Sequence, residues 1–311
     1  MVRGPELRVA VAGGYGVGLT MQLPRFPQPG ETVTDGVLSS GHGGKGSNQA
    51  VGAARLGAEV SLLSAVGSDA AGTDAVAMWA VEGVDAGAVL RAAEATMTGF
   101  ILVDAAGENC IAIAPGALGS LQNAHAEAFR SRIAGADIVL VSLEIPLAVA
   151  VRVLEIAAEE GVPTILNPAP APGALPASVW RHVTYLTPNR SEALALLGGP
   201  PRSTPELAAD LARLTGGIVI LTLGDEGAIV ASAADQVAID PVPAAAVVDT
   251  TGAGDAFNAA LAVALAAGVE PVAAARWAAQ AGSYSVAHAG ALPGLPRRAD
   301  LGELPHAGPT P

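Results

Sequence analysis

Short apolar runs alternate along the chain with longer, alanine-rich segments that have a helical period. The short runs have the length typical of buried strands, and turn residues bound them. They predict strands over residues 7–12, 60–65, 138–141, 164–167, 185–187 and 218–222. The longer segments predict helices over residues 45–56, 73–82, 147–160, 190–197, 204–214 and 255–267. Strands that alternate with helices form a mostly parallel sheet with helices on both faces, so the pattern predicts an α/β fold.

Two segments interrupt this alternation. Residues 20–40 are extended, contain several prolines and show an apolar–polar period of two from Glu31 onward. Residues 96–115 have the pattern of a hairpin with its turn at 105–107. Neither segment has a helix to cover its second face. We therefore expect a small antiparallel β-sheet lid, formed by about residues 16–42 and 96–115, on a single domain that spans residues 1–311.

Composition narrows the classes of partner. The chain has 311 residues, of which 51% are hydrophobic and only 3% aromatic, and no apolar run approaches the ~20 residues of a membrane span. The formal net charge of −13 argues against nucleic acid and anionic membranes as partners. The single cysteine, Cys110, excludes an internal disulfide and fits the reducing cytoplasm, where we expect it as a small packed side chain.

The strongest chemical signal is the run Asp249-Thr-Thr-Gly-Ala-Gly-Asp-Ala-Phe-Asn258, which joins a strand-like segment to a predicted helix. Gly252 and Gly254 allow a turn whose backbone N–H groups point at an anion at the positive end of the helix dipole. A carboxylate beside such a turn would repel a phosphate unless it has a chemical role. In phosphoryl transfer, Asp255 would accept the proton of the attacking hydroxyl. The alternative is an acid that only decorates the first helical turn.

A second glycine-rich run, Gly41-His-Gly-Gly-Lys-Gly-Ser-Asn-Gln-Ala50, precedes another predicted helix. Lys45 offers a positive charge there, and Asn48 offers a donor and an acceptor suited to a sugar hydroxyl. The run does not match a Walker A loop, and loop glycines before a helix are often only structural. The glycines of segment 14–18 suggest a dinucleotide fingerprint, but an extended, proline-rich segment follows where that fingerprint requires a helix.

Together, the two glycine-rich runs resemble the paired signatures of the PfkB carbohydrate kinase family, with the closest likeness to its ribokinases. Further matching blocks are Phe26-Pro-Gln-Pro-Gly-Glu-Thr-Val, Leu143-Glu-Ile-Pro, Asn167-Pro-Ala-Pro-Ala, Thr187-Pro-Asn-Arg-Ser-Glu and Thr222-Leu-Gly-Asp-Glu-Gly. The resemblance covers roughly residues 7 to 300. It implies a ribokinase-like three-layer α/β/α sandwich with a small β-sheet lid, ATP as phosphoryl donor, and a homodimer formed through the lid.

The resemblance also implies roles for individual positions. Asp255 would be the catalytic base, and the amides of Gly252, Ala253 and Gly254 would form the anion hole. The sugar would be bound at Gly16, Gly18, Gly44, Lys45, Asn48, Glu144 and Asp255. The nucleotide would be bound at Asn189, Thr222, Gly224 and Gly227. Glu192 would organise Mg²⁺, through water, and a K⁺-type monovalent cation would be held by Asp249, Thr251, Ser285, His288 and Gly290.

One departure from the family pattern concerns the substrate. Ribokinases begin with Gly-Ser-x-Asn-x-Asp, whose Asn and Asp hold sugar hydroxyls, whereas this chain has Gly16 and Gly18 at those two places. Each lost hydrogen bond to a charged or buried group costs about 1.5–3 kcal/mol. The intervening Tyr15 is expected to point into the core. A lesser departure is Gly294, near the predicted cation loop, where ribokinases often carry serine.

Three functions therefore remain open at this stage. The first is transfer of phosphate from ATP to the primary hydroxyl of D-ribose, giving ribose 5-phosphate. The second is the same reaction on a different sugar, sugar acid or nucleoside, which Gly16 and Gly18 favour. The third is a sugar- or nucleotide-binding protein without catalysis, against which the complete Asp255 motif argues.

Overall fold

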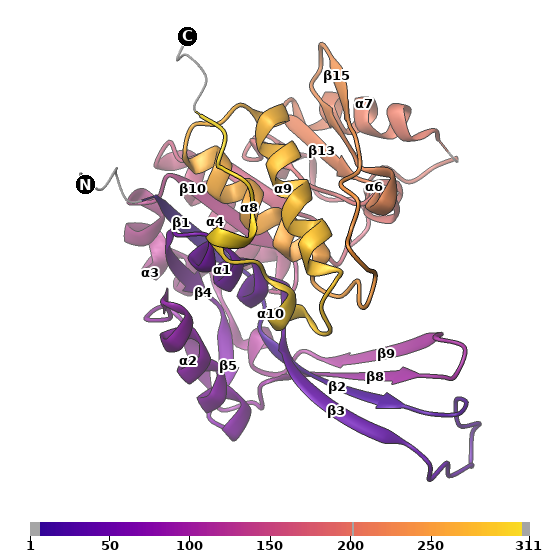
Figure 1. Cartoon of the computed structure of the whole chain (residues 1–311). Helices are drawn as coiled ribbons and strands as arrows, with labels where there is room; N and C mark the ends of the chain where they lie inside the picture. Colours follow the sequence, from indigo (N-terminus) through magenta and orange to yellow (C-terminus); the bar gives the residue numbers. More distant parts are fainter. Residues whose placement is uncertain (1–6, 201, 307–311) are drawn as a thin grey trace.

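A nine-stranded sheet forms the centre of the molecule (Figure 1). The computed structural model describes residues 7–200 and 202–306. The strand order is β15-β14-β13-β12-β11-β10-β1-β4-β6, parallel except for the antiparallel pairs β13–β14 and β14–β15. The strands are β1 (Arg8–Ala12), β4 (Glu59–Leu63), β6 (Val84–Asp85), β10 (Ile138–Ser142), β11 (Thr164–Asn167), β12 (Tyr185–Leu186), β13 (Ile218–Thr222), β14 (Ala228–Ala231) and β15 (Gln236–Ile239).

Helices cover both faces of this sheet. Residues that alternate along a strand point to opposite faces, so they are buried in two separate cores. Val9 and Val11 of β1 belong to one core, whereas Ala10 and Ala12 belong to the other. The first core is covered by α1 (Lys45–Arg55), α2 (Ala70–Glu82), α8 (Ala253–Ala266) and α9 (Pro271–Ser285). The second is covered by α3 (Asn123–Ala134), α4 (Leu147–Glu159), α5 (Ala177–Trp180), α6 (Arg190–Leu197) and α7 (Thr204–Thr215). The predicted three-layer α/β/α sandwich is confirmed.

The strands and helices of the predicted alternation are present, with small shifts at their ends, but the strand-like segment that precedes Asp249 forms no strand. Helix α2, for example, starts at Ala70 instead of 73, because the Asp69 side chain accepts a hydrogen bond from Gly72 N and caps the helix. The sequence reasoning missed α3, α9 and the β14–β15 hairpin. Helix α9 carried a usable signal, since Pro271 occupies its first turn.

A separate four-stranded sheet extends from one end of the main domain (Figure 1). Its order is β3-β2-β8-β9, from β2 (Gly16–Gln22), β3 (Val37–Gly43), β8 (Met97–Val103) and β9 (Asn109–Ala114). The sheet is mixed, so its prediction as antiparallel was wrong: β2 pairs with β8 in parallel. The apolar–polar alternation from Glu31 onward is not a strand over its first residues, because β3 starts only at Val37.

The expected burial of Cys110 was wrong as well. This side chain is exposed on β9, all of whose residues are exposed, and no helix of the described residues lies over that strand in Figure 1. Two further short strands, β5 (Ala65–Gly67) and β7 (Leu90–Ala92), pair with each other. A short helix, α10 (Ala291–Gly294), follows α9.

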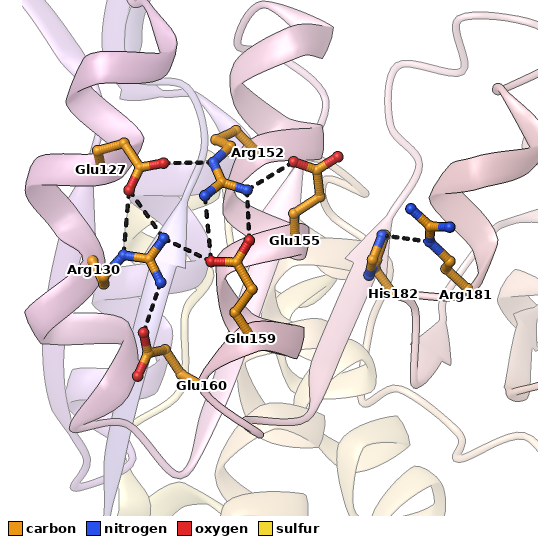
Figure 2. A network of polar contacts seen from close by, with 8 residues as sticks. All are labelled: Glu127, Arg130, Arg152, Glu155, Glu159, Glu160, Arg181 and His182. Atoms are coloured by element: carbon orange, nitrogen blue, oxygen red, sulfur yellow. Dashed lines mark hydrogen bonds and ion pairs between the residues drawn. The ribbon is translucent and has the colours of Figure 1, made fainter.

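Ion pairs tie neighbouring helices together. On the surface, Arg130 of α3 and Arg152 of α4 share a network of carboxylates (Figure 2), formed by Glu127, Glu155, Glu159 and Glu160. Exposed pairs of this kind contribute only ~0–1 kcal/mol each. A less exposed pair, Arg55 with Glu82, links α1 to α2. None of the helices in the described part of the chain is long and apolar enough to cross a membrane.

Candidate active site

The two glycine-rich runs lie at the N-termini of α1 and α8, two helices that pack against each other. Gly44 precedes α1 with φ 92°, and a Cβ atom there would lie 2.5 Å from Tyr15 Cα. A Cβ at Gly46 would lie 2.3 Å from the carbonyl carbon of Gly13. Only glycine fits these places, and its use brings the start of α1 against the end of β1.

Asp255, in the first turn of α8, is held by two amide side chains from α1. Asn48 Nδ2 donates to Asp255 Oδ2 at 2.8 Å, and Gln49 Nε2 donates to Asp255 Oδ1 at 3.0 Å. The Asp255 side chain is buried, with 6% relative exposure. The structure thus joins two motifs that the sequence separates widely, and it fixes both carboxylate oxygens in place.

The charges of three acidic groups act on the Lys45 ammonium group, and they belong to Asp255, Glu144 and Glu192. Burial raises the pKa of Asp255, while the Lys45 charge and the two amide donors oppose that rise. Burial and the Asp255 charge raise the pKa of Glu144 to about 7. Burial also raises the pKa of Glu192. Burial lowers the pKa of Lys45, but the three carboxylates raise it by more, so the ammonium group stays charged. The site therefore concentrates ionisable groups in a low-dielectric environment.

Gln49 is a site residue that the sequence analysis missed, and it links the buried carboxylate to a longer chain of hydrogen bonds. Gln49 Nε2 also donates to Asn167 Oδ1 at 3.0 Å, and Asn167 Nδ2 donates to Thr187 O at 3.1 Å. Thr187 Oγ1 donates to Asn258 Oδ1 at 2.6 Å, and Asn258 Nδ2 donates to Gly254 O at 2.8 Å. The side chains of this chain are buried. The network starts at the carboxylate and returns to the anion turn, so it holds these two parts of the site in a fixed relation.

The anion turn has the expected geometry. Gly252 adopts φ 85°, where a Cβ would lie 2.9 Å from Ala291. Apart from its chain neighbours and the backbone of its own helix, no atom of the described residues lies within 4 Å of the Cβ position of Gly254. The first amides of an α-helix have no acceptor inside the helix. Ala253 N donates to Thr250 O at 3.3 Å, which gives it a weak partner within the turn. The open space beside Gly254 leaves room for an anion at the helix N-terminus.

Glu144, which follows β10, contacts the start of α1. Glu144 Oε2 accepts a hydrogen bond from Lys45 N at 2.6 Å. A carboxylate at that position also interacts favourably with the positive end of the α1 dipole. Glu144 therefore has a structural partner of its own, in addition to its expected contact with a sugar.

The predicted nucleotide positions lie on two adjacent segments. Asn189 and Thr222 form a β-bridge. The Asn189 side chain caps α6 by accepting from Glu192 N at 2.8 Å, and Glu192 Oε2 accepts from Asn189 N at 2.8 Å. Gly224 and Gly227 shape the turn after β13, with φ 63° and 91°. A Cβ at Gly227 would lie 2.1 Å from Ile239 O, so this glycine is needed for packing.

Glu192 is the carboxylate that the sequence analysis assigned to Mg²⁺. No group of three or more His, Cys, Asp and Glu side chains within the described ranges could hold a metal by itself. Mg²⁺ is commonly bound through one or two carboxylates, water and substrate phosphates, and this donor set agrees with that chemistry.

The predicted monovalent-cation loop is brought together only in part. Asp249 Oδ1 accepts from Thr251 N at 2.9 Å, and Asp249 Oδ2 accepts from Gly290 N at 2.8 Å. Ser285 Oγ is buried and has no hydrogen-bond partner in the described part of the chain. His288 stacks on the Tyr284 ring at 4.5 Å, and its Nδ1 lies 3.0 Å from Tyr284 O. A carboxylate, hydroxyl and carbonyl oxygens suit a hard cation, whereas the imidazole of His288 is engaged elsewhere.

Gly16 and Gly18 lie on β2, opposite Gly43 and Gly41 of β3. The neighbouring Tyr15 is fully buried, as expected, and its hydroxyl lies 2.7 Å from His42 Nδ1. The two glycines therefore sit directly beside the start of α1, where the sequence analysis placed the sugar.

Known proteins share both the sequence pattern and the fold. The pattern of the pfkB family carbohydrate kinases matches residues 16–298. The ribokinase of Bacillus subtilis (strain 168) is 37% identical over 297 residues, which cover 95% of this chain and 98% of that protein. The ribokinase of Schizosaccharomyces pombe is 34% identical, over 93% of this chain and 95% of that protein. The structure of Arabidopsis thaliana ribokinase complexed with ribose and ATP has a TM-score of 0.88 at 29% identity, covering 95% of this chain and 97% of that chain. The ribokinase-like fold is thereby confirmed.

Proposed function

The chain belongs to the pfkB family of carbohydrate kinases, and we propose that it transfers the γ-phosphoryl group of ATP to the primary hydroxyl of a sugar, with D-ribose as the first candidate. The observation that carries this proposal is Asp255, buried and held by two amide side chains beside the open helix N-terminus. The Arabidopsis thaliana relative was solved with ribose and ATP, which supports both substrates.

In the proposed reaction, Asp255 accepts the proton of the sugar hydroxyl as that oxygen forms a bond to the γ-phosphorus. The bond between the γ-phosphorus and the bridging β-γ oxygen breaks, and ADP leaves. The N-terminal amides of α8, from Gly252 to Gly254, stabilise the charge on the moving phosphoryl group. Lys45 keeps its positive charge beside the reacting groups, while Asn48 and Glu144 orient the sugar hydroxyls.

We assign the nucleotide to Asn189, Thr222 and the turn from Gly224 to Gly227. Glu192 would hold Mg²⁺ through water, and Mg²⁺ would supply charge neutralisation on the phosphates. K⁺ would be held by oxygens of Asp249 and Ser285, whose hydroxyl has no hydrogen-bond partner among the described residues. His288 contributes least to this site, because its ring stacks on Tyr284.

We propose further that the small sheet acts as a lid, formed by about residues 16–42 and 96–115, and that lids of two chains pair in a homodimer. Large apolar side chains exposed on this sheet support pairing, and they are Val37, Leu38, Phe100, Ile111 and Ile113. The molecular mass in solution at increasing protein concentration checks the homodimer. The cytoplasmic location stays a prediction.

The proposal is tested by measuring ADP formation with a panel of pentoses, hexoses and nucleosides, for the wild type and for Asp255→Ala. Loss of a general base costs ~10²–10⁴-fold, so the variant should lose that factor in kcat while its fold and ATP binding persist. Asp74→Ala, which removes an exposed acid of α2, is the matched control and should keep full activity. A variant that keeps more than about a tenth of the wild-type kcat would contradict the role of Asp255. If the wild type forms no ADP with any acceptor, the non-catalytic binding protein becomes the better description.

A further inference from the structure

Arg55, in the last turn of α1, uses all three nitrogens of its guanidinium group in contacts with two other segments. Its Nε and Nη2 atoms donate to the two carboxylate oxygens of Glu82, at 2.9 and 2.6 Å. Its Nη1 atom donates to Leu292 O at 2.8 Å and to Leu295 O at 2.9 Å. Both charged side chains have a relative exposure of 11%. The arginine is therefore a largely buried link from α1 and α2 to the segment 291–295.

The segment that Arg55 contacts is held only weakly by its own backbone. Helix α10 has four residues, and its hydrogen bonds from Gly294 N to Gly290 O and from Leu295 N to Leu292 O are long, at 3.3 and 3.4 Å. A single helical turn is unstable by itself in water, so tertiary contacts hold this segment in place. The two bonds from Arg55 are shorter and come from a charged donor, which makes them the stronger ones.

Helix α10 in turn packs against the anion turn at the start of α8 (Figure 1). A Cβ at Gly252 would lie 2.9 Å from both Cα and Cβ of Ala291, so the turn lies directly on the first residue of α10. The residue before it, Gly290, donates to Asp249 Oδ2 at 2.8 Å. A shift of α10 would therefore move the turn whose amides are assigned to the phosphoryl group.

Arg55 itself is remote from the reacting groups. Lys45 begins α1 and Arg55 ends it, so a helix of 11 residues separates them by about 15 Å. A residue at that distance affects the chemistry only by fixing the groups that touch the substrates. The effect can still be large, because a misplacement of about 1 Å at the reacting atoms can cost ~10²-fold in rate.

Resting on the proposed function, we propose that Arg55 is a positioning residue for phosphoryl transfer. Its two bonds to carbonyl oxygens fix α10, and α10 in turn fixes the anion turn from Gly252 to Gly254. Glu82 orients the guanidinium group by accepting from its other two nitrogens. A purely structural ion pair would join α1 to α2 and leave the anion turn unaffected. The two roles depend on different atoms of Arg55, so variants can separate them.

The first test compares kcat and KM of the wild type, Arg55→Met and Glu82→Gln, with ATP and the sugar that the wild type uses best. Both variants break the same ion pair, but only Arg55→Met removes the donor to the two carbonyl oxygens. Glu82→Gln keeps a side-chain oxygen that can accept from the guanidinium group. The assays are run at a temperature at which circular dichroism shows all three proteins folded.

We expect Arg55→Met to lower kcat by about 10- to 100-fold while the KM for the sugar stays within about twofold. Glu82→Gln should keep kcat within about twofold of the wild type. Equal losses of kcat in the two variants would overturn the inference, because they would trace the effect to the ion pair. A wild-type kcat in folded Arg55→Met, or a loss that falls on KM alone, would overturn it as well.

Backbone hydrogen exchange, followed by mass spectrometry, tests the same inference without any activity. Peptides that cover residues 249–256 and 286–296 should exchange about tenfold faster in Arg55→Met than in Glu82→Gln. Peptides that cover residues 218–239 should exchange alike in both variants. Equal exchange of all these peptides in the two variants would overturn the inference. If the wild type forms no ADP with any acceptor, the proposed function fails, whereas this measurement still decides whether Arg55 fixes the turn.

Arg55→Lys carries the test if Arg55→Met does not fold. Its ammonium group keeps a positive charge beside Glu82 but lacks the planar fork that reaches the carboxylate and both carbonyl oxygens together. We expect a smaller loss of kcat in the same direction, with faster exchange of residues 286–296. A wild-type kcat and wild-type exchange in this variant would show that α10 is held without the arginine, and the inference would be wrong.

Discussion

Replacing Gln49 by methionine should change how tightly Asp255 binds a proton. Methionine has a similar length but no donor, so Asp255 Oδ1 loses the hydrogen bond of 3.0 Å that stabilises the carboxylate. A hydrogen bond to a charged group contributes about 1.5–3 kcal/mol, which corresponds to about 10- to 150-fold tighter proton binding when it is lost. The pKa of Asp255, already raised by burial, should rise further.

The readout is the pH profile of kcat. An acid with a higher pKa is ionised over a narrower range, so the acid limb of the profile should move to higher pH in Gln49→Met. Activity should recover at alkaline pH, where the carboxylate is ionised again. Gln280→Met serves as control, because Gln280 lies on α9 and its side-chain oxygen accepts a hydrogen bond from Gly302 N, which is not a site residue.

The result that would refute this reasoning is a loss of kcat that is equal at every pH. Such a loss would mean that Gln49 only supports the packing around Asn167, to which it also donates. An unchanged kcat would show that Asn48 alone holds the carboxylate.

Three other predictions follow from the same geometry. Burial raises the pKa of Glu144 to about 7, so kcat/KM for the sugar should fall as the pH drops below about 7, and Glu144→Gln should remove that dependence. Because the folded state favours the neutral carboxyl, the stability it contributes is present at low pH and is lost as the pH rises through about 7, which thermal unfolding of the same variant checks. Replacing K⁺ by a large organic cation at constant ionic strength should lower kcat if oxygens around Asp249 bind K⁺, and an equal rate would contradict that site. Arg55→Met leaves Glu82 at 11% side-chain exposure without its main partner, so it should lower the free energy of unfolding by about 3–5 kcal/mol in denaturant titrations, and a loss below about 1 kcal/mol would contradict this estimate.

The fold and the two central motifs were predictable because their signals are local. Strand and helix periods are read within a single segment, and the alternation of those segments restricts the topology. The acidic residue, the glycines and the lysine of the site lie in two short runs. Glycine occurs before these helices because the backbone adopts a geometry, or makes a close approach, that a side chain would prevent. This requirement is local to the segment.

Contacts between distant segments were beyond that reasoning. Gln49 and Asp255 are separated by 206 positions, and Thr187 and Asn258 by 71, so no local pattern marks them as partners. The parallel pairing of β2 with β8 escaped for the same reason, since a hairpin-like sequence does not reveal which strand lies beside it. The exposure of Cys110 depended on the absence of a covering helix over β9.

The sequence by itself determined the α/β fold, the family and the place of the proposed catalytic carboxylate, because each depends on residues close together in the chain. Only the tertiary structure decided which amides hold that carboxylate and which residue of β8 lies over Gly16. The glycine at position 16 looked in the sequence like a missing polar group, but the register of β8 places the Met97 methyl group over it. The character of a binding surface depends on cross-strand neighbours, and strand register is a property of the whole sheet rather than of any one segment.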